Sequence, residues 1–133
     1  MASIFTKIIQ GEIPSYKIAE TEHYYAFLDI RPLVKGHVLA VPKMEVDYLF
    51  DLPDEVLTGL MAFAKKVSKA IEAVVPCKRV GVLVVGTEVP HAHIHLIPFN
   101  KEKEMYLGNK PVEMEQEEFT TLAQKISDKY LEL

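Results

Sequence analysis

Cysteine is scarce in this sequence of 133 residues: Cys77 stands alone and cannot form a disulfide within the chain. A lone thiol suits a reducing compartment. Long apolar runs are also missing, because none approaches the ~20 residues that cross a bilayer, and residues 1–5 carry no signal-peptide profile. We therefore expect a soluble, cytoplasmic protein that has no membrane partner.

An excess of positive charge is absent too, since the formal net charge is -4 at pH 7. This balance argues against a broad nucleic-acid footprint, although it is compatible with one nucleotide in a pocket. The sequence has no internal repeats and no low-complexity segments. Because 49% of its residues are hydrophobic, it can bury one core, and we expect a single domain over residues 1–133.

Apolar residues recur with helical spacing in some segments and with strand spacing in others, which predicts an α+β architecture. Ser3 can cap a short helix that Gly11 ends. Pro53 opens the longest helix, whose apolar stripe runs from Val56 to Val74. The other expected elements are strands over residues 16–20, 24–28, 37–41 and 79–85, the last of them buried, a strand around residues 91–97, and a helix from residue 115.

Three histidines, His91, His93 and His95, occupy alternate positions of one apolar segment, and this stretch is the most informative in the chain. In a strand, alternate residues share a face, so the three imidazoles should line one side while Ala92 and Ile94 pack on the other. The first and third Cα atoms would then lie about 13 Å apart. One zinc ion would bind two neighbouring rings easily but all three only with strain, so the row is better suited to groups along a polyphosphate-like chain.

The residues from His91 to Ile97 resemble the histidine-triad pattern, in which three histidines alternate with apolar residues. Further blocks are similar to the same family in the same order, and together they cover residues 3–99: Ser3 to Pro14, Ala26 to Pro32 and Gly36 to Lys43. The chain thus resembles the histidine triad (HIT) family, in its Hint-like branch of nucleoside phosphoramidases and nucleotide hydrolases. The resemblance implies a HIT-like fold with a mainly antiparallel sheet of about five strands, and residues 100–133 would form a C-terminal extension with a helix.

The resemblance also implies covalent catalysis on phosphorus. His93 would attack an α-phosphorus and form a nucleotidyl-imidazole intermediate, which water then hydrolyses. His91 and His95 would orient His93, hold phosphate oxygens and help to protonate the leaving group, and either of them can be the acid. His37 matches the family's fourth histidine and is a candidate for the phosphate pocket.

A nucleotide site follows from the same resemblance. Asp29 would accept hydrogen bonds from the ribose hydroxyls. The positions matched to the base site are apolar, and in an unrelated fold most would be ordinary core residues: Ile4, Phe5, Ile8, Phe27, Leu28, Ile30 and Leu39. An apolar slot accepts a purine face with few specifying hydrogen bonds, so adenine and guanine both stay open. The expected protein needs no metal or cofactor and is a homodimer, in which a second copy would cover the stripe from Val56 to Val74.

The loop before the triad departs from the family pattern. Many members have an asparagine on the preceding strand and a Gly-Gln-Ser/Thr run before the triad, whereas residues 82–85 here are all apolar. In the loop, Thr87 is a candidate to replace a lost hydroxyl, and Glu88 stands where a small hydroxyl residue is common. Because a carboxylate ~4 Å from a phosphate would cost roughly 4 kcal/mol, Glu88 should face away from the phosphate. Glu45 likewise replaces a histidine found in some relatives.

We therefore expect a hydrolase or transferase that acts on the α-phosphate of a small nucleotide substrate, with a purine nucleoside phosphoramidase as the leading interpretation. Three alternatives stay open. The first is a dinucleoside polyphosphate hydrolase, and the second is a nucleotide-binding or scaffold protein with vestigial turnover. The third is a protein whose triad strand is structural and carries a histidine metal site.

Overall fold

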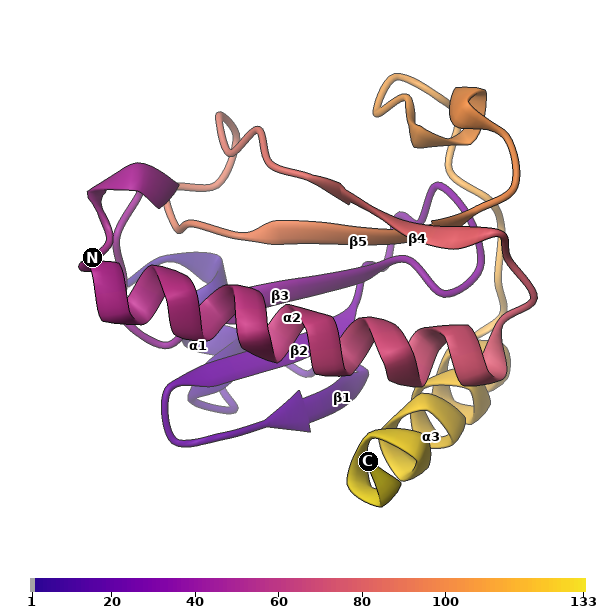
Figure 1. Ribbon diagram of the computed structural model, residues 1–133, viewed down its shortest axis with the longest axis horizontal. Helices are drawn as coiled ribbons and strands as arrows, with labels where there is room; N and C mark the ends of the chain where they lie inside the picture. Colours follow the sequence, from indigo (N-terminus) through magenta and orange to yellow (C-terminus); the bar gives the residue numbers. More distant parts are fainter. Residues whose placement is uncertain (1) are drawn as a thin grey trace.

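A single antiparallel sheet organises the chain, and the computed structural model describes residues 2–133 (Figure 1). The strands are β1 (Lys17–Glu20), β2 (Tyr24–Leu28), β3 (Val38–Pro42), β4 (Arg79–Leu83) and β5 (Ile94–Phe99), in the spatial order β1-β2-β3-β5-β4. The helices are α1 (Ile4–Ile9), α2 (Asp54–Val74) and α3 (Gln116–Glu132), with 3-10 turns at Leu49–Asp51 and Glu102–Met105. The predicted α+β architecture with five antiparallel strands is confirmed.

The two faces of the sheet carry separate apolar clusters, because side chains alternate along β2 and β3. The larger cluster lies on the face that α2 and α3 cover, and Figure 1 shows α2 running across the sheet. The smaller cluster lies on the other face and joins Phe5 of α1 to Tyr25, Phe27, Leu39 and Val41. The sheet therefore has one face for the main core and one face for a second, smaller packing layer beside α1.

The apolar stripe of α2 packs inside this chain. Its buried members all face the sheet and α3: Leu60, Phe63, Ala64, Val67, Ala70 and Ile71. The expectation that a second copy covers this stripe is therefore wrong, because the sheet offers a face long enough for the helix to bury its apolar side. Pro53 precedes α2, and the negative charges of Asp54 and Glu55 in its first turn interact favourably with the positive end of the helix dipole.

The strand predicted as buried over residues 79–85 is an exposed edge strand. β4 ends at Leu83 and, within the part of the chain that the structure describes, pairs only with β5. The exposed fractions of Val82 and Val85 are both 51%. A β-branched apolar run is common to buried strands and to edge strands, so its composition does not reveal whether a second strand lies beside it. The prediction was wrong about burial for that reason.

The triad strand starts later than predicted. β5 begins at Ile94, where its pairing with β3 starts opposite Ala40. Just before it, the Ala92 backbone N–H donates to the Val46 carbonyl at 2.7 Å, so the chain there follows the segment after β3 instead of a strand partner. His91 and His93 therefore precede the strand, and both rings still contact Phe5 on one face while Ala92 packs in the main core on the other.

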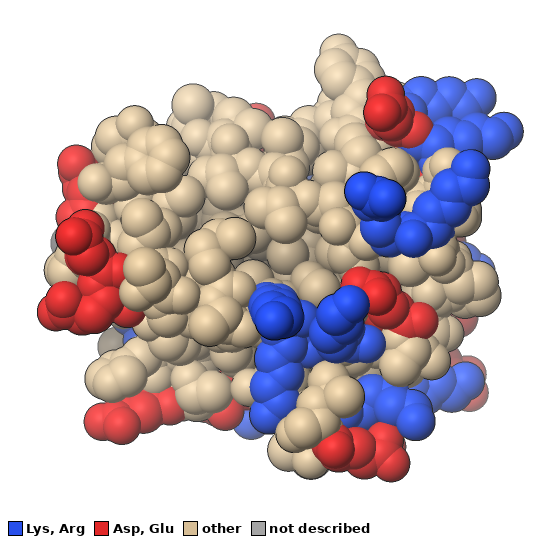
Figure 2. Space-filling view, viewed as in Figure 1, with Lys and Arg blue, Asp and Glu red and all other residues tan. Residues whose placement is uncertain are grey.

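The surface and the helices bear on the predicted partners. On the face seen in Figure 2, acidic side chains lie along the left edge and also among the basic ones on the right and at the lower centre, and a wide uncharged area covers the upper left and centre. Among residues 2–133, none of the helices combines the length and the apolar character that a membrane crossing requires. The cytoplasmic location stays a prediction.

Candidate active site

The triad side chains line the face of the sheet that carries α1. The ring centroids of His93 and His95 are 5.1 Å apart, and Phe5 of α1 contacts His93 edge-on at 5.0 Å. Ala92 and Ile94 lie in the main core on the opposite face. The alternation read from the sequence thus brings the histidines together beside α1, with two of them packed against one aromatic ring.

His93 presents an unprotonated ring nitrogen to the site. Its Nδ1 lies 2.8 Å from the His91 carbonyl oxygen, which can only accept, so Nδ1 carries the proton and donates it. In the neutral ring the lone pair is then on Nε2. Every fully buried polar side-chain atom of residues 2–133 has a partner, whereas no hydrogen bond within these residues occupies Nε2, so this atom is not completely buried, although the His93 side chain as a whole is. This arrangement is the one that a nucleophilic imidazole requires.

His91 has no free ring nitrogen. Its Nε2–H donates to the Pro42 carbonyl at 2.8 Å, and its Nδ1 therefore accepts, at 2.7 Å, from the Ser3 hydroxyl. The ring is fully buried, and burial lowers its pKa below the usual range. His91 is therefore a neutral ring held from both sides, and both of its nitrogens are occupied by protein groups.

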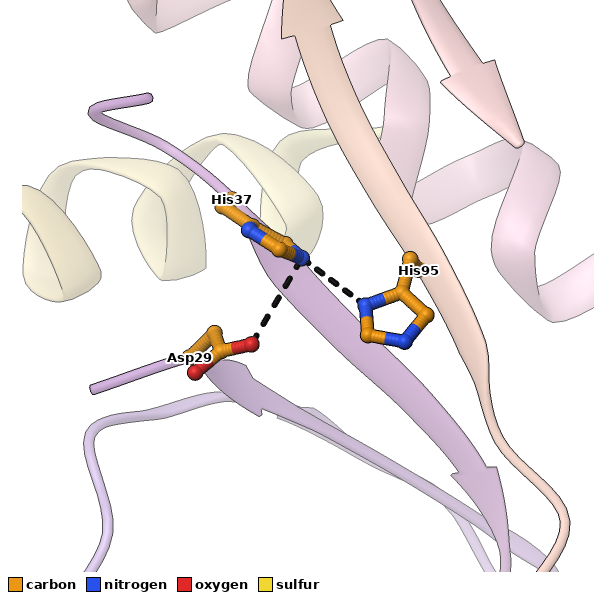
Figure 3. A group of neighbouring side chains, drawn as sticks. All are labelled: Asp29, His37 and His95. Atoms are coloured by element: carbon orange, nitrogen blue, oxygen red, sulfur yellow. Dashed lines mark hydrogen bonds and ion pairs between the residues drawn. The ribbon is translucent and has the colours of Figure 1, made fainter. Parts of the chain in front are cut away.

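His37 and His95 form a hydrogen-bonded pair beside Asp29 (Figure 3). The Leu33 backbone N–H donates to His37 Nδ1 at 3.0 Å, so the proton of neutral His37 is on Nε2. The Nε2 atom of His37 lies 2.9 Å from His95 Nδ1, to which it donates, and 3.6 Å from Asp29 Oδ2. His95 Nδ1 consequently accepts, and its proton is on Nε2, which has no partner within residues 2–133. His37 itself is buried, and its Nε2–H fixes the tautomer of the His95 ring. Its place in a phosphate pocket stays a prediction.

Burial also sets the charge of this pair. It lowers the pKa of His95 from the usual 6.5 to about 4, with further lowering by His37 and His93 and an opposing effect of Asp29. The pKa of His37 is lowered by burial too, and the Asp29 carboxylate opposes that shift. Both rings are therefore uncharged near neutral pH, and His95 offers a neutral N–H donor to the site.

A metal ion does not suit this pair as the structure arranges it. One ligand atom each from Asp29, His37 and His95 lies within 4.8 Å of the others, which is a spacing that a metal ion could bridge. However, the Leu33 N–H occupies His37 Nδ1, so the Nε2 that would face the metal carries the proton of the neutral ring. The tautomer therefore disfavours the interpretation of the triad region as a metal site.

Part of the expected base site comes together beside the triad. Phe5, Phe27 and Leu39 are buried in the smaller cluster, and Ile8 packs against it. Leu28 belongs to the main core instead, because it follows Phe27 in β2 and points to the opposite face. Ile4 and Ile30 are exposed, with exposed fractions of 49% and 70%.

Comparison with known proteins decides the family. The family model described as the HIT domain matches residues 10–102. This chain belongs to the histidine-triad family. It is 46% identical over 107 residues to adenosine 5'-monophosphoramidase HNT1 of Saccharomyces cerevisiae, a match that covers 77% of this chain and only 65% of the yeast protein. Adenosine 5'-monophosphoramidase hnt1 of Schizosaccharomyces pombe is 37% identical over 135 residues, with 97% of this chain and 98% of that protein covered.

A solved structure extends the likeness of this HIT protein to the fold. The crystal structure of a Hit-like protein from Bartonella henselae matches it with a TM-score of 0.81 at 28% identity, covering 96% of this chain and 95% of that chain. The predicted HIT-like fold and the predicted resemblance to the phosphoramidase branch are both confirmed. The division into a core to residue 99 and an extension from residue 100 stays a prediction.

In this HIT protein the loop that departs from the family pattern is exposed. Thr87 and Glu88 both lie at the surface between β4 and β5. The expectation that Glu88 faces away from a bound phosphate stays a prediction, as does the hydroxyl role of Thr87.

Sequence reasoning missed three side chains that surround His91. Ser3 hydrogen-bonds the ring, while Thr6 and Glu45 hydrogen-bond each other and Ser3. The sequence predicts Ser3 as a helix cap and as part of a family-like block but not as a partner of His91; the cap is confirmed, because the Ser3 Oγ accepts the Thr6 N–H at 3.0 Å. For Glu45 the sequence shows only a departure from relatives. That substitution at 45 was the one available signal, since Ser3 and His91 are 88 positions apart in the sequence.

Proposed function

We propose that this HIT protein is a hydrolase that cleaves a purine nucleoside phosphoramidate at the α-phosphorus, with His93 as the nucleophile. The observation that carries the proposal is the tautomer of His93, because the Nδ1–H bond to the His91 carbonyl leaves the lone pair on Nε2, which has no hydrogen-bond partner within residues 2–133. The names of the two yeast relatives support a phosphoramidase over a dinucleoside polyphosphate hydrolase.

The reaction would proceed in two displacements. First, His93 Nε2 forms a bond to the α-phosphorus while the bond from phosphorus to the amine nitrogen breaks, and the leaving amine takes up a proton from solvent. Water then attacks the same phosphorus, the Nε2–phosphorus bond breaks, and the attacking water releases one proton to solvent. The products are a nucleoside monophosphate and the free imidazole of His93. The ring carries positive charge while it is joined to phosphorus, and the His91 carbonyl that accepts its Nδ1–H stabilises that charge.

The two flanking histidines would have different tasks. His91 cannot meet the substrate through a ring nitrogen, because Ser3 and Pro42 occupy both. His95 has its Nε2–H open to the site, and its low pKa of about 4 keeps the ring neutral near pH 7. We infer that His95 donates a hydrogen bond to the phosphate oxygens or the leaving nitrogen, whereas His91 positions His93.

The nucleoside would lie between the smaller apolar cluster and Asp29. Phe5, Phe27 and Leu39 are almost completely buried, so they would form the apolar floor beneath a purine face, which needs few hydrogen bonds. Asp29 is partly exposed at the end of β2, and its Oδ1 accepts the Arg31 N–H at 2.9 Å. Its other oxygen can accept from a ribose hydroxyl.

A homodimer formed through β4 is the second part of the proposal. β4 leaves one edge without a strand partner within residues 2–133, and Val82 in this strand and Val84 and Val85 just after it are exposed. Figure 2 shows mostly uncharged side chains over the upper left and centre of this face, near where β4 and the loop after it run in Figure 1. A long apolar edge is a template for another strand, and pairing with the same edge of a second copy would satisfy it with two-fold symmetry.

Turnover of a nucleoside phosphoramidate in the presence of a metal chelator tests the proposed activity. We expect release of amine and nucleoside monophosphate by the wild type, faster than cleavage of a dinucleoside polyphosphate, and near-complete loss of turnover with bound nucleotide retained in His93→Ala. Binding without turnover by the wild type would favour the nucleotide-binding alternative. Turnover that the chelator abolishes would contradict the metal-free mechanism.

A further inference from the structure

Glu45 joins the start of α1 to the segment that follows β3. Its Oε1 accepts the Ser3 backbone N–H at 2.7 Å and the Thr6 hydroxyl at 2.6 Å. These two hydrogen bonds lower the pKa of the Glu45 carboxyl below its usual range, although the side chain is exposed. The proposed chemistry uses none of these three side chains directly.

Ser3 supplies the hydrogen-bond donor for the second nitrogen of the His91 ring. Because Nε2 must donate to the Pro42 carbonyl, the neutral ring has a bare Nδ1 that needs a donor. The Ser3 Oγ lies 2.7 Å from that atom, whereas the Thr6 Oγ1 is 3.4 Å away and directs its proton to Glu45. Ser3 has an exposed fraction of only 6%, so water has little access to replace its hydroxyl.

The position of His91 in turn restrains the ring of the nucleophile, His93. Its ring is held from two sides, and the carbonyl of the same residue accepts the Nδ1–H of His93 at 2.8 Å. A shift of His91 would therefore move the acceptor that sets both the tautomer and the direction of the His93 ring. Misplacement of a reacting group by about 1 Å can cost a rate factor on the order of 100.

We propose that Glu45 is a positioning residue for His93: it fixes Ser3, which holds the His91 ring, whose backbone carbonyl orients the nucleophile. This inference rests on the proposed function, since alignment of His93 matters only if that ring reacts. The carboxylate is exposed and its charge is screened, so its task is to offer one oxygen to two donors. A glutamine at position 45 keeps such an oxygen, whereas a leucine does not.

Steady-state kinetics with the phosphoramidate provides the first test. We expect Glu45→Leu to lower kcat roughly tenfold or more with little change in KM, because alignment of the nucleophile is lost while the nucleotide pocket is kept. Glu45→Gln should retain most of kcat, and Glu113→Leu, at an exposed acidic residue before α3, is the matched control. Adding Glu45→Leu to Ser3→Ala should lower kcat little further, because both changes break one link.

Nitrogen-15 NMR of the imidazoles provides a second readout that does not depend on activity. The wild type and Glu45→Gln should show His91 with its proton on Nε2, and Glu45→Leu and Ser3→Ala should show a mixture of tautomers. If Glu45→Leu does not fold, Ser3→Ala makes the same comparison, because it removes the hydroxyl that forms the link. A wild type without turnover would refute the proposed function, whereas an active wild type with an equally fast Glu45→Leu and an unchanged His91 tautomer would refute the positioning role.

Discussion

Acid should destabilise the folded protein through His95. In the folded chain this ring accepts a hydrogen bond from His37, and burial lowers its pKa from 6.5 to about 4. Between these two pH values the unfolded chain binds a proton at His95 and the folded chain does not. The contribution to stability is therefore fully present above pH 6.5 and is lost as the pH falls toward 4.

The size of this effect follows from the shift of the pKa. For one such ring, proton linkage between pH 7 and pH 5 amounts to ~2 kcal/mol of unfolding free energy. The His95 side chain is partly exposed, so solvent screening reduces this value, and we expect about 1–2 kcal/mol.

Urea unfolding of the wild type and of His95→Asn at pH 7 and at pH 5 measures this loss of unfolding free energy. The asparagine oxygen can accept the His37 Nε2–H as Nδ1 does, but it does not titrate. His37 and His91 titrate in both proteins, so the difference between the two proteins isolates His95. The wild type should lose about 1–2 kcal/mol more than the variant on acidification. An equal loss in the two proteins would refute the neutral, hydrogen-bonded state of His95.

Two further predictions concern packing and assembly. Gly59→Ala should destabilise the protein by about 1–2 kcal/mol in thermal or urea unfolding, although alanine favours helices. The reason is that the new Cβ would overlap the Tyr24 hydroxyl, which donates to the Val56 carbonyl. A stabilised variant would show that Tyr24 moves aside freely. Val82→Lys should convert a dimer into a monomer in light scattering at micromolar concentration, whereas Val112→Lys, at an exposed valine before α3, should not. A monomeric wild type would exclude the dimer.

The helices and most strands were predictable because their apolar residues repeat with the period of the element. Leu60 and Val67 of α2, for example, recur at helical spacing and are both buried. The edge position of β4 was not predictable, because Val82 and its neighbours would have the same sequence beside a second strand. Leu28 was assigned to the base site by resemblance, although strand alternation alone would have separated it from Phe27.

The face shared by the histidines was predictable, but their protonation pattern was not. Alternation places His91, His93 and His95 together whatever surrounds them. Their tautomers depend on the Ser3 hydroxyl, on backbone groups such as the Pro42 carbonyl, and on His37, all of which are distant in the sequence. No periodic pattern encodes such contacts, so the distinction between His91 and His95 required the three-dimensional structure.

The central claim is that His93 forms a covalent bond to the α-phosphorus, and trapping that intermediate tests it most directly. The wild type is mixed with a nucleoside phosphoramidate and quenched within milliseconds in denaturant at alkaline pH, because a phosphorus–imidazole bond is labile to acid. Peptide mass spectrometry with fragmentation then assigns the modified ring. We predict a nucleotide on His93 and none on the same peptide of His93→Ala. A nucleotide on His91 or His95, or unimpaired turnover by His93→Ala, would contradict the account.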